Sequence, residues 1–280
     1  MTVKPGGGGD FSLLPSVYPK SLRAHVDAVG RFVRVGEELA DSTWLSRRQR
    51  LERIDGLRAR LSGHPVDVAW SGDARDAVDD LRASLDRFRA PAEPLDQVLA
   101  ALRDLVAGAD LHSWGDLRAH CRKAASPVGL HLLSVAGENT KECKSALDQM
   151  CAALWILKRM RDCRNPAKPI HAFGIPKQFV DDAAISVVHL RAPTAKGQTR
   201  AVLDRLLDGV DHLLSEAALL PWHFKTRGPR LHSAIALCRA RKLARRLRHQ
   251  DPLSERVELE PGERHRCYGS AWLRWLLGWR

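Results

Sequence analysis

Apolar residues recur every three or four positions along most of the chain, a spacing that is typical of amphipathic helices. The pattern is clearest over residues 20–41, 141–164 and 198–220. One face of the last segment collects five aliphatic residues: Val202, Leu206, Val210, Leu213 and Leu214. Runs of β-branched residues are short, which disfavours β-strands. The pattern therefore predicts an all-α protein.

Clusters of Gly, Pro, Asn and Asp divide these helical patterns. The expected breaks lie near residues 62–65, 90–94, 108–113, 165–176, 191–197, 226–229 and 250–254. Ser113 and Asp116 have the spacing of a capping box, and Pro127 can occupy the first turn of a new helix. We expect residues 1–10, "MTVKPGGGGD", to form a disordered Gly-rich tail and residues 11–280 to form one helical domain.

The chain is strongly basic, with a formal net charge of +12 and a sequence pI of about 9.9. Such a charge attracts anions, which include nucleic acids, anionic lipids and diphosphate esters, but it does not choose among them. The basic segment 239–250 carries Leu243 and Leu247 one turn apart, and no nucleic-acid-binding motif accompanies it. We therefore favour a solvated helix face there and expect no nucleic-acid partner.

Six cysteines stand at positions without a CxxC pair or a zinc-site spacing: Cys121, Cys143, Cys151, Cys163, Cys238 and Cys267. Most fall within helical patterns, so we interpret them as reduced thiols of a cytoplasmic protein. No signal peptide and no apolar run long enough to cross a membrane is recognisable, so we expect a soluble or peripheral protein.

The helix predicted over residues 20–41 carries the first candidate site. Its apolar stripe collects Leu22, Val26, Val29, Val33, Gly36 and Ala40. Arg34, Glu37 and Asp41 lie at the edge of this stripe, whereas Glu38 points towards water. Two carboxylates at positions i and i+4 can reach one hard cation such as Mg²⁺. Solvated acids at a helix edge are the more common explanation of this spacing alone.

The helix predicted over residues 141–164 carries the second candidate site. Its apolar stripe collects Leu147, Met150, Cys151, Leu154 and Leu157. Lys158 and Asp162 continue this stripe, so they either form an ion pair with each other at the helix end or line a polar cavity.

Three stretches share features with one known enzyme family. They are "SVYPKSLRAHVDAVGRFVRVGEELAD" (16–41), "HCRKAASPVGLHLLSVAGE" (120–138) and "SALDQMCAALWILKRMRDC" (145–163). The chain resembles the squalene/phytoene synthase family in these stretches, and most closely its hydroxysqualene-synthase branch of bacterial hopanoid biosynthesis. The resemblance covers nearly all of the chain after residue 10.

The resemblance implies a helical bundle of the isoprenoid-synthase type around a central apolar cavity, and the processing of farnesyl or presqualene diphosphate. By this resemblance Mg²⁺ would be held by Glu37, Glu38, Asp41 and Asp162. The substrate diphosphate would meet Arg34, Arg122 and Lys158. His120 stands where the family has a Tyr, and we predict a catalytic role for His120 and Lys158. Partner enzymes of the same pathway would be expected as well.

The second acidic motif departs from the family pattern. Lys158, Asp162 and Pro166 stand where the family has an Asn and two Asp residues. Lys158 could replace a metal ion with a fixed positive charge beside the diphosphate. Alternatively, the chain is a catalytically inactive relative that binds prenyl diphosphates or serves as a partner or assembly protein.

The C-terminal stretch "AWLRWLLGWR" places Trp272, Trp275, Leu276 and Trp279 on one helical face. Such a stripe usually packs on the core of a protein. Trp and Arg also suit a membrane surface, so peripheral contact with the inner membrane is the alternative.

Overall fold

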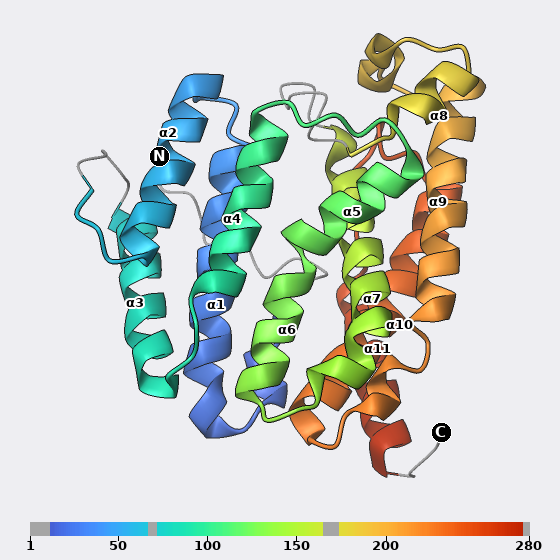
Figure 1. Cartoon of the computed structure of the whole chain (residues 1–280). Helices are drawn as coiled ribbons and strands as arrows, with labels where there is room; N and C mark the ends of the chain where they lie inside the picture. Colours follow the sequence, from blue (N-terminus) through green and yellow to red (C-terminus); the bar gives the residue numbers. More distant parts are fainter. Residues whose placement is uncertain (1–11, 67–71, 165–173, 277–280) are drawn as a thin grey trace.

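The computed structural model of the chain describes residues 12–66, 72–164 and 174–276 and, within these ranges, contains helices and no β-strand (Figure 1). The long helices are α1 (Lys20–Ala40), α2 (Arg47–Leu61), α3 (Gly72–Phe88), α4 (Glu93–Val106), α5 (Trp114–Ala124), α6 (Ser126–Val135), α7 (Thr140–Arg161), α9 (Gln198–Glu216), α10 (Arg227–His249) and α11 (Pro261–Leu276). Shorter turns are η1 (Pro15–Val17), η2 (Asp162–Arg164), α8 (Lys177–Asp182), η4 (Val187–Arg191) and η5 (Leu220–His223). The prediction of an all-α fold is confirmed.

Local sequence signals set the ends of several helices. Ser113 accepts a hydrogen bond from the backbone N–H of Asp116, and the Asp116 carboxylate accepts one from the N–H of Ser113, so the predicted capping box opens α5. Pro127 lies in the first turn of α6, as predicted, because a proline there loses no helical hydrogen bond. The predicted tail at residues 1–10 lies outside the described residues, as does most of the break at 165–176.

The core consists of two apolar clusters. The first contains buried side chains of α1 to α4, the start of α10 and α11. The second contains those of α5, α7, α9 and the second half of α10. Helix α6 joins them, because Leu132 packs in the first cluster and Leu133 in the second. In Figure 1, α1 to α4 occupy one side of the molecule and α7 to α10 the other, with α6 between them.

Helix α1 forms the inner wall of the first group of helices, and α7 forms that of the second. Helix α1 packs on α3 and α4, whereas α7 packs on α9, α6 and α5. The predicted stripe of α1 is only partly correct, because Phe32 and His25 are fully buried whereas Leu22 and Val33 are half-buried. The two helices run in the same direction, so their carboxyl ends lie at the same end of the bundle (Figure 1).

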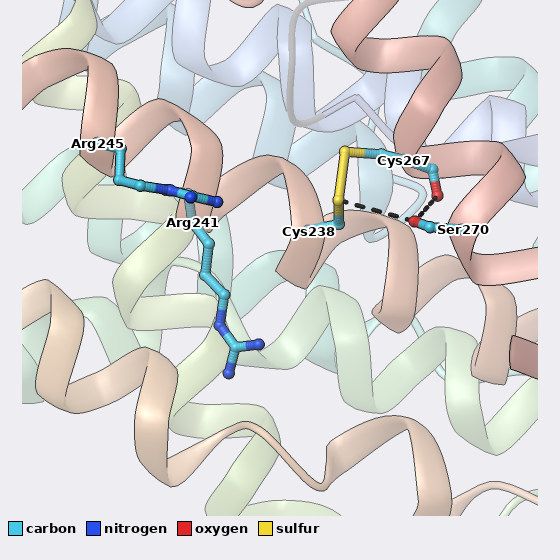
Figure 2. The surroundings of a disulfide bond; sticks show 5 residues. All are labelled: Cys238, Arg241, Arg245, Cys267 and Ser270. Atoms are coloured by element: carbon cyan, nitrogen blue, oxygen red, sulfur yellow. Dashed lines mark hydrogen bonds between the residues drawn. A yellow bond between two sulfur atoms is a disulfide. The ribbon is translucent and has the colours of Figure 1, made fainter. Parts of the chain in front are cut away.

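The prediction that all cysteines are reduced is wrong for one pair. Figure 2 shows that Cys238 of α10 and Cys267 of α11 form a disulfide bond, with 5.7 Å between their Cα atoms. The remaining cysteines are free thiols, and they are buried or half-buried. Sequence spacing did not reveal the pair because its members lie 29 residues apart on two helices that pack on each other.

The solvated face predicted over residues 239–250 occupies one side of α10, whereas the other side is buried. Leu243 and Leu247 are completely buried, and the buried Arg239 places its guanidinium 5.1 Å from the ring of Tyr268. Arg241 and Arg245 of the same helix are exposed (Figure 2). No helix among the described residues has the length and apolar character that crossing a membrane requires.

Candidate functional site

The carboxyl ends of α1 and α7 are joined by ion pairs. Lys158 donates a hydrogen bond from Nζ to Oε2 of Glu37. Arg159 donates a hydrogen bond to Asp41, with 2.5 Å between Nη1 and Oδ1. We call these four residues the α1–α7 seam. The seam brings together the two segments that the sequence singled out, although they lie more than a hundred residues apart.

Arg159 is a site residue that the sequence analysis missed. Its side chain is only 5% exposed, and its guanidinium lies 5.0 Å from the ring centroid of Trp155, one turn earlier on α7. Burial alone would lower the pKa of Arg159, but the carboxylates of Asp41 and Glu37 outweigh this effect and raise it. The spacing of Trp155 and Arg159 on one helical face is the signal that could have revealed this residue.

His120 of α5 packs against the same Trp155 ring. The two rings meet edge to face with their centroids 5.1 Å apart. Burial, together with the positive charges of Arg159 and Lys123, lowers the pKa of His120 to about 4. His120 is therefore neutral at pH 7. Its Nε2 atom is buried and has no hydrogen-bond partner in the part of the chain that the structure describes.

The ion pair that the sequence suggested between Lys158 and Asp162 does not form. Lys158 instead reaches across to Glu37 on α1. Asp162 follows α7 and accepts hydrogen bonds from its neighbour Arg161, with 2.9 Å between Nε and Oδ1. The expected pair fails because α1 offers Lys158 a carboxylate at the same end of the bundle.

The remaining predicted residues are more widely spread. Arg34 and Glu38 are exposed on α1. Arg122 lies on α5 in a different pocket, which it shares with Lys141 and Lys144 of the first turns of α7. Lys144 precedes Lys158 by fourteen residues on the same helix, a distance of roughly 21 Å. The structure therefore does not bring Arg122 to the seam.

Three of the four carboxylates predicted to bind Mg²⁺ are engaged in ion pairs. Mg²⁺ requires several oxygen ligands in octahedral geometry. Glu37, Asp41 and Asp162 are each paired with a cationic side chain, and among the described residues no three His, Cys, Asp or Glu side chains gather as a metal site. Mg²⁺ binding would therefore require Glu37 and Asp41 to leave Lys158 and Arg159.

The sequence model of the squalene/phytoene synthase family matches residues 5–263 of the chain. The chain belongs to this family. It is 29% identical over 247 residues to a hydroxysqualene synthase of Sinorhizobium fredii, which covers 88% of this chain and 82% of the relative. It is 30% identical over 233 residues to a hydroxysqualene synthase of Rhodopseudomonas palustris, which covers 83% of this chain and 77% of the relative.

Solved structures of the family share the fold. The crystal structure of squalene synthase HpnC from Alicyclobacillus acidocaldarius has a TM-score of 0.64 at 23% identity and covers 84% of this chain and 86% of its own. A dehydrosqualene synthase in complex with a ligand has a TM-score of 0.72 at 19% identity and covers 95% of this chain and 90% of its own. The helical bundle is thus that of the squalene/phytoene synthase family.

Proposed function

We infer that the chain is a prenyl synthase of squalene or hopanoid biosynthesis that acts on farnesyl or presqualene diphosphate. Membership of the family and two relatives named hydroxysqualene synthase support this function. The observation that carries the proposal is the α1–α7 seam, where Lys158 and Arg159 of one helix meet the acidic end of the other.

The reaction requires positive charge at the place where the substrate ionises. Loss of diphosphate from a prenyl substrate leaves a carbocation and a highly charged anion, and an enzyme accelerates the step by stabilising that anion. Lys158 is one-third exposed, so its ammonium group can reach a bound diphosphate. The next residue, Arg159, is buried, and its ion pair with Asp41 favours the charged form of the guanidinium. In this proposal both fixed cations attract the leaving diphosphate, and Arg34 approaches it from α1.

Two residues beside the seam, Trp155 and His120, suit the carbocation that the reaction forms. The ring of Trp155 already carries a guanidinium on its face and can stabilise a second cation by the same interaction. His120 is neutral at pH 7 and has a free buried Nε2 atom, so it can accept a proton. We propose that His120 accepts the proton that a carbocation or an attacking water loses.

Mg²⁺ stays a prediction. Bound at Glu37, Glu38, Asp41 and Asp162, it would neutralise the diphosphate as a Lewis acid. The ion pairs of Glu37 and Asp41 instead favour a reaction in which the cations of the chain perform this task.

The proposal is tested by turnover. Purified protein is incubated separately with farnesyl and presqualene diphosphate, and both diphosphate release and lipid products are followed. The account predicts turnover by the native chain, a fall of about a hundredfold or more in kcat for Lys158→Ala, and partial recovery in Lys158→Arg. Lys20→Ala at the exposed start of α1, the opposite end of that helix from the seam, is the matched control and should retain the native rate. A folded protein that binds neither substrate would contradict the proposal.

A second candidate is a catalytically inactive family member that binds prenyl diphosphates or assists a partner enzyme. The same ion pairs favour it, because they neutralise the acids without a metal. Binding of farnesyl diphosphate without product formation, in the presence and absence of Mg²⁺, would identify this function.

Peripheral membrane contact is a further part of the proposal. Arg227 places its guanidinium 4.1 Å from the ring of Trp272 and 5.2 Å from that of Trp275. Leu273 and Leu276, which lie on α11 with Trp272 and Trp275, are 58% and 66% exposed. Aromatic, basic and exposed apolar side chains together suit the interface of a bilayer. Co-sedimentation with anionic vesicles should fall when Leu273 and Leu276 are both changed to Ser. Unchanged sedimentation would contradict this part.

A further inference from the structure

A basic pocket lies between α5 and the first turns of α7, with a volume of about 390 Å³. We call it the α5–α7 pocket. Its polar lining comprises Arg118, Arg122, Lys141, Lys144, Ser145, Asp148 and Gln149. The arginines are one turn apart on α5, and the lysines lie on the facing side of α7. A pocket of this size can hold a small organic anion.

The positive charge of the pocket is mostly uncompensated. Its one carboxylate, Asp148, is paired with Lys144, with 2.7 Å between Oδ2 and Nζ. Arg118 donates a hydrogen bond to the uncharged side chain of Gln149, with 3.0 Å between the donor and acceptor. Among the described residues, Arg122 and Lys141 have no carboxylate within ion-pair distance.

This lack of compensation differs from the pattern on α2. Arg58 and Arg60 of α2 are each held by two hydrogen bonds to a carboxylate, those of Asp96 and Asp79 respectively. In the α5–α7 pocket, Arg122 and Lys141 have no such carboxylate among the residues that the structure describes. Arginine forks and lysine ammonium groups that converge on one space bind phosphate strongly.

Asp148 adds a second requirement for the ligand. Its Oδ1 atom is buried and has no hydrogen-bond partner among the described residues. A buried acceptor without a partner lowers stability, and a hydroxyl group of a ligand would satisfy it. The pocket thus combines a phosphate-binding group of cations with an acceptor for a nearby hydroxyl.

We propose that the α5–α7 pocket binds a phosphate ester that carries a hydroxyl group close to the phosphate, with the chemistry of glycerol phosphate. Such a group occurs free in solution and as the headgroup of phosphatidylglycerol. Arg122 and Lys141 bind the phosphate, and Asp148 accepts the hydroxyl. The site is independent of the proposed function, because it lies on a different part of α7 from Lys158.

The soluble ligand is tested by calorimetry with glycerol 3-phosphate and with inorganic phosphate. The proposal predicts that glycerol 3-phosphate binds more tightly than inorganic phosphate. The double substitution Arg122→Ala/Lys141→Ala should weaken its binding about tenfold or more. Both side chains are exposed, so the fold should be kept, and Arg122→Ala alone provides a second variant.

The matched control is Arg241→Ala/Arg245→Ala. It removes the same charge from two exposed arginines one turn apart on α10 (Figure 2). This control should change the affinity by less than about twofold, because long-range charge effects are screened by salt. Equal weakening in both double variants would overturn the proposal, since general attraction by the basic chain would then explain the binding.

Binding to a lipid headgroup is tested by sedimentation with vesicles of phosphatidylglycerol in phosphatidylcholine. Vesicles of phosphatidylcholine alone serve as the comparison. Sedimentation that depends on phosphatidylglycerol and is lost in Arg122→Ala/Lys141→Ala would assign the lipid headgroup. Binding of glycerol 3-phosphate without this sedimentation would assign the free ester. Absence of both kinds of binding would overturn the proposal.

The role of Asp148 is tested by Asp148→Ala. The preference for glycerol 3-phosphate over inorganic phosphate should disappear, because the acceptor is lost while the phosphate-binding cations remain. A preference that persists in this variant would show that Asp148 does not select the ligand.

Discussion

Arg159 in the last turn of α7 is bound to Asp41 at the end of α1, with 2.5 Å between Nη1 and Oδ1, and its side chain is almost fully buried. The cation that sequence reasoning had not considered is thus the one that holds the first acidic motif. Lys158 and Arg159 of α7 provide two positive charges at the junction of the two helices, and Glu37 and Asp41 of α1 provide two negative charges. The α1–α7 seam is therefore both a structural joint and the candidate site.

Removal of Asp41 tests the structural part of this relationship. Asp41→Ala should lower the free energy of unfolding by about 3 kcal/mol, because it leaves the buried guanidinium of Arg159 without its main partner. Asp80→Ala is the control on a neighbouring helix. It removes a carboxylate from an ion pair with Arg31 whose side chains are 38% and 54% exposed, and it should cost less than about 1 kcal/mol. Urea denaturation of both variants measures the difference, and equal losses would contradict the account.

Substitution of Glu37 separates a fixed-cation site from a metal site. Glu37→Gln removes the carboxylate that neutralises Lys158. If Lys158 binds the diphosphate directly, the variant should bind farnesyl diphosphate several-fold more tightly, since its ammonium group no longer has a competing partner. Calorimetry without and with Mg²⁺ measures this affinity. Weaker binding, together with a loss of dependence on Mg²⁺, would show instead that Glu37 is a metal ligand.

Buried histidines make the stability depend on pH. Burial lowers the pKa values of His120, His131 and His232 to about 4, against 6.5 for an unperturbed histidine. The unfolded chain therefore binds more protons than the folded chain between these values, so stability is full above about pH 6.5 and falls as the pH decreases towards 4. Between pH 7.5 and 5.5 the loss should be about 1 kcal/mol per histidine.

The measurement is urea denaturation at both pH values. His232, whose Nδ1 lies 3.0 Å from the hydroxyl of Tyr18, offers a specific check. In His232→Gln the loss of unfolding free energy between pH 7.5 and 5.5 should be smaller by the contribution of one histidine, about 1 kcal/mol. Equal stability at pH 5.5 and 7.5 in the native chain would contradict the assignment of neutral buried imidazoles.

The disulfide bond gives a direct chemical prediction. Without a reductant, the denatured chain should expose the thiols of Cys121, Cys143, Cys151 and Cys163 only, and after reduction all six cysteines should react. Removal of the bond by Cys238→Ala/Cys267→Ala should lower the free energy of unfolding by about 2–4 kcal/mol, because the unfolded chain gains freedom. A thiol titration that finds six reactive groups before reduction would disprove the bond.

The sequence predicted those parts of the structure that depend on local pattern. The span of α1, the capping box of Ser113 and the start of α6 at Pro127 follow from residues close in the chain. Features that depend on packing between distant helices were missed or wrong. Lys158 was expected to pair with Asp162 or to line a polar cavity, but it pairs with Glu37, and Cys238 was expected to be a free thiol. Only the three-dimensional arrangement of helices provides these partners.

The family resemblance and the structure single out the same two helix ends, those of α1 and α7, and the roles of their residues stay predictions. Spacing alone favoured solvated acids at Glu37 and Asp41, whereas both acids are paired with cations from α7. Arg122 was assigned to the same site, yet it belongs to the α5–α7 pocket. A sequence motif identifies the segment of the chain that contributes to a site. Packing between helices decides which neighbours each residue of that segment meets.

The most direct test of the central claim is the rate of diphosphate release from presqualene diphosphate by the native chain, measured with Mg²⁺ and with EDTA. The account predicts product formation in both conditions, with the rate in EDTA within about tenfold of the rate with Mg²⁺, because Lys158 and Arg159 supply fixed positive charge. Release that occurs only with Mg²⁺ would contradict the role of these cations. No release in either condition, from protein with a native helical spectrum, would contradict the enzymatic function itself.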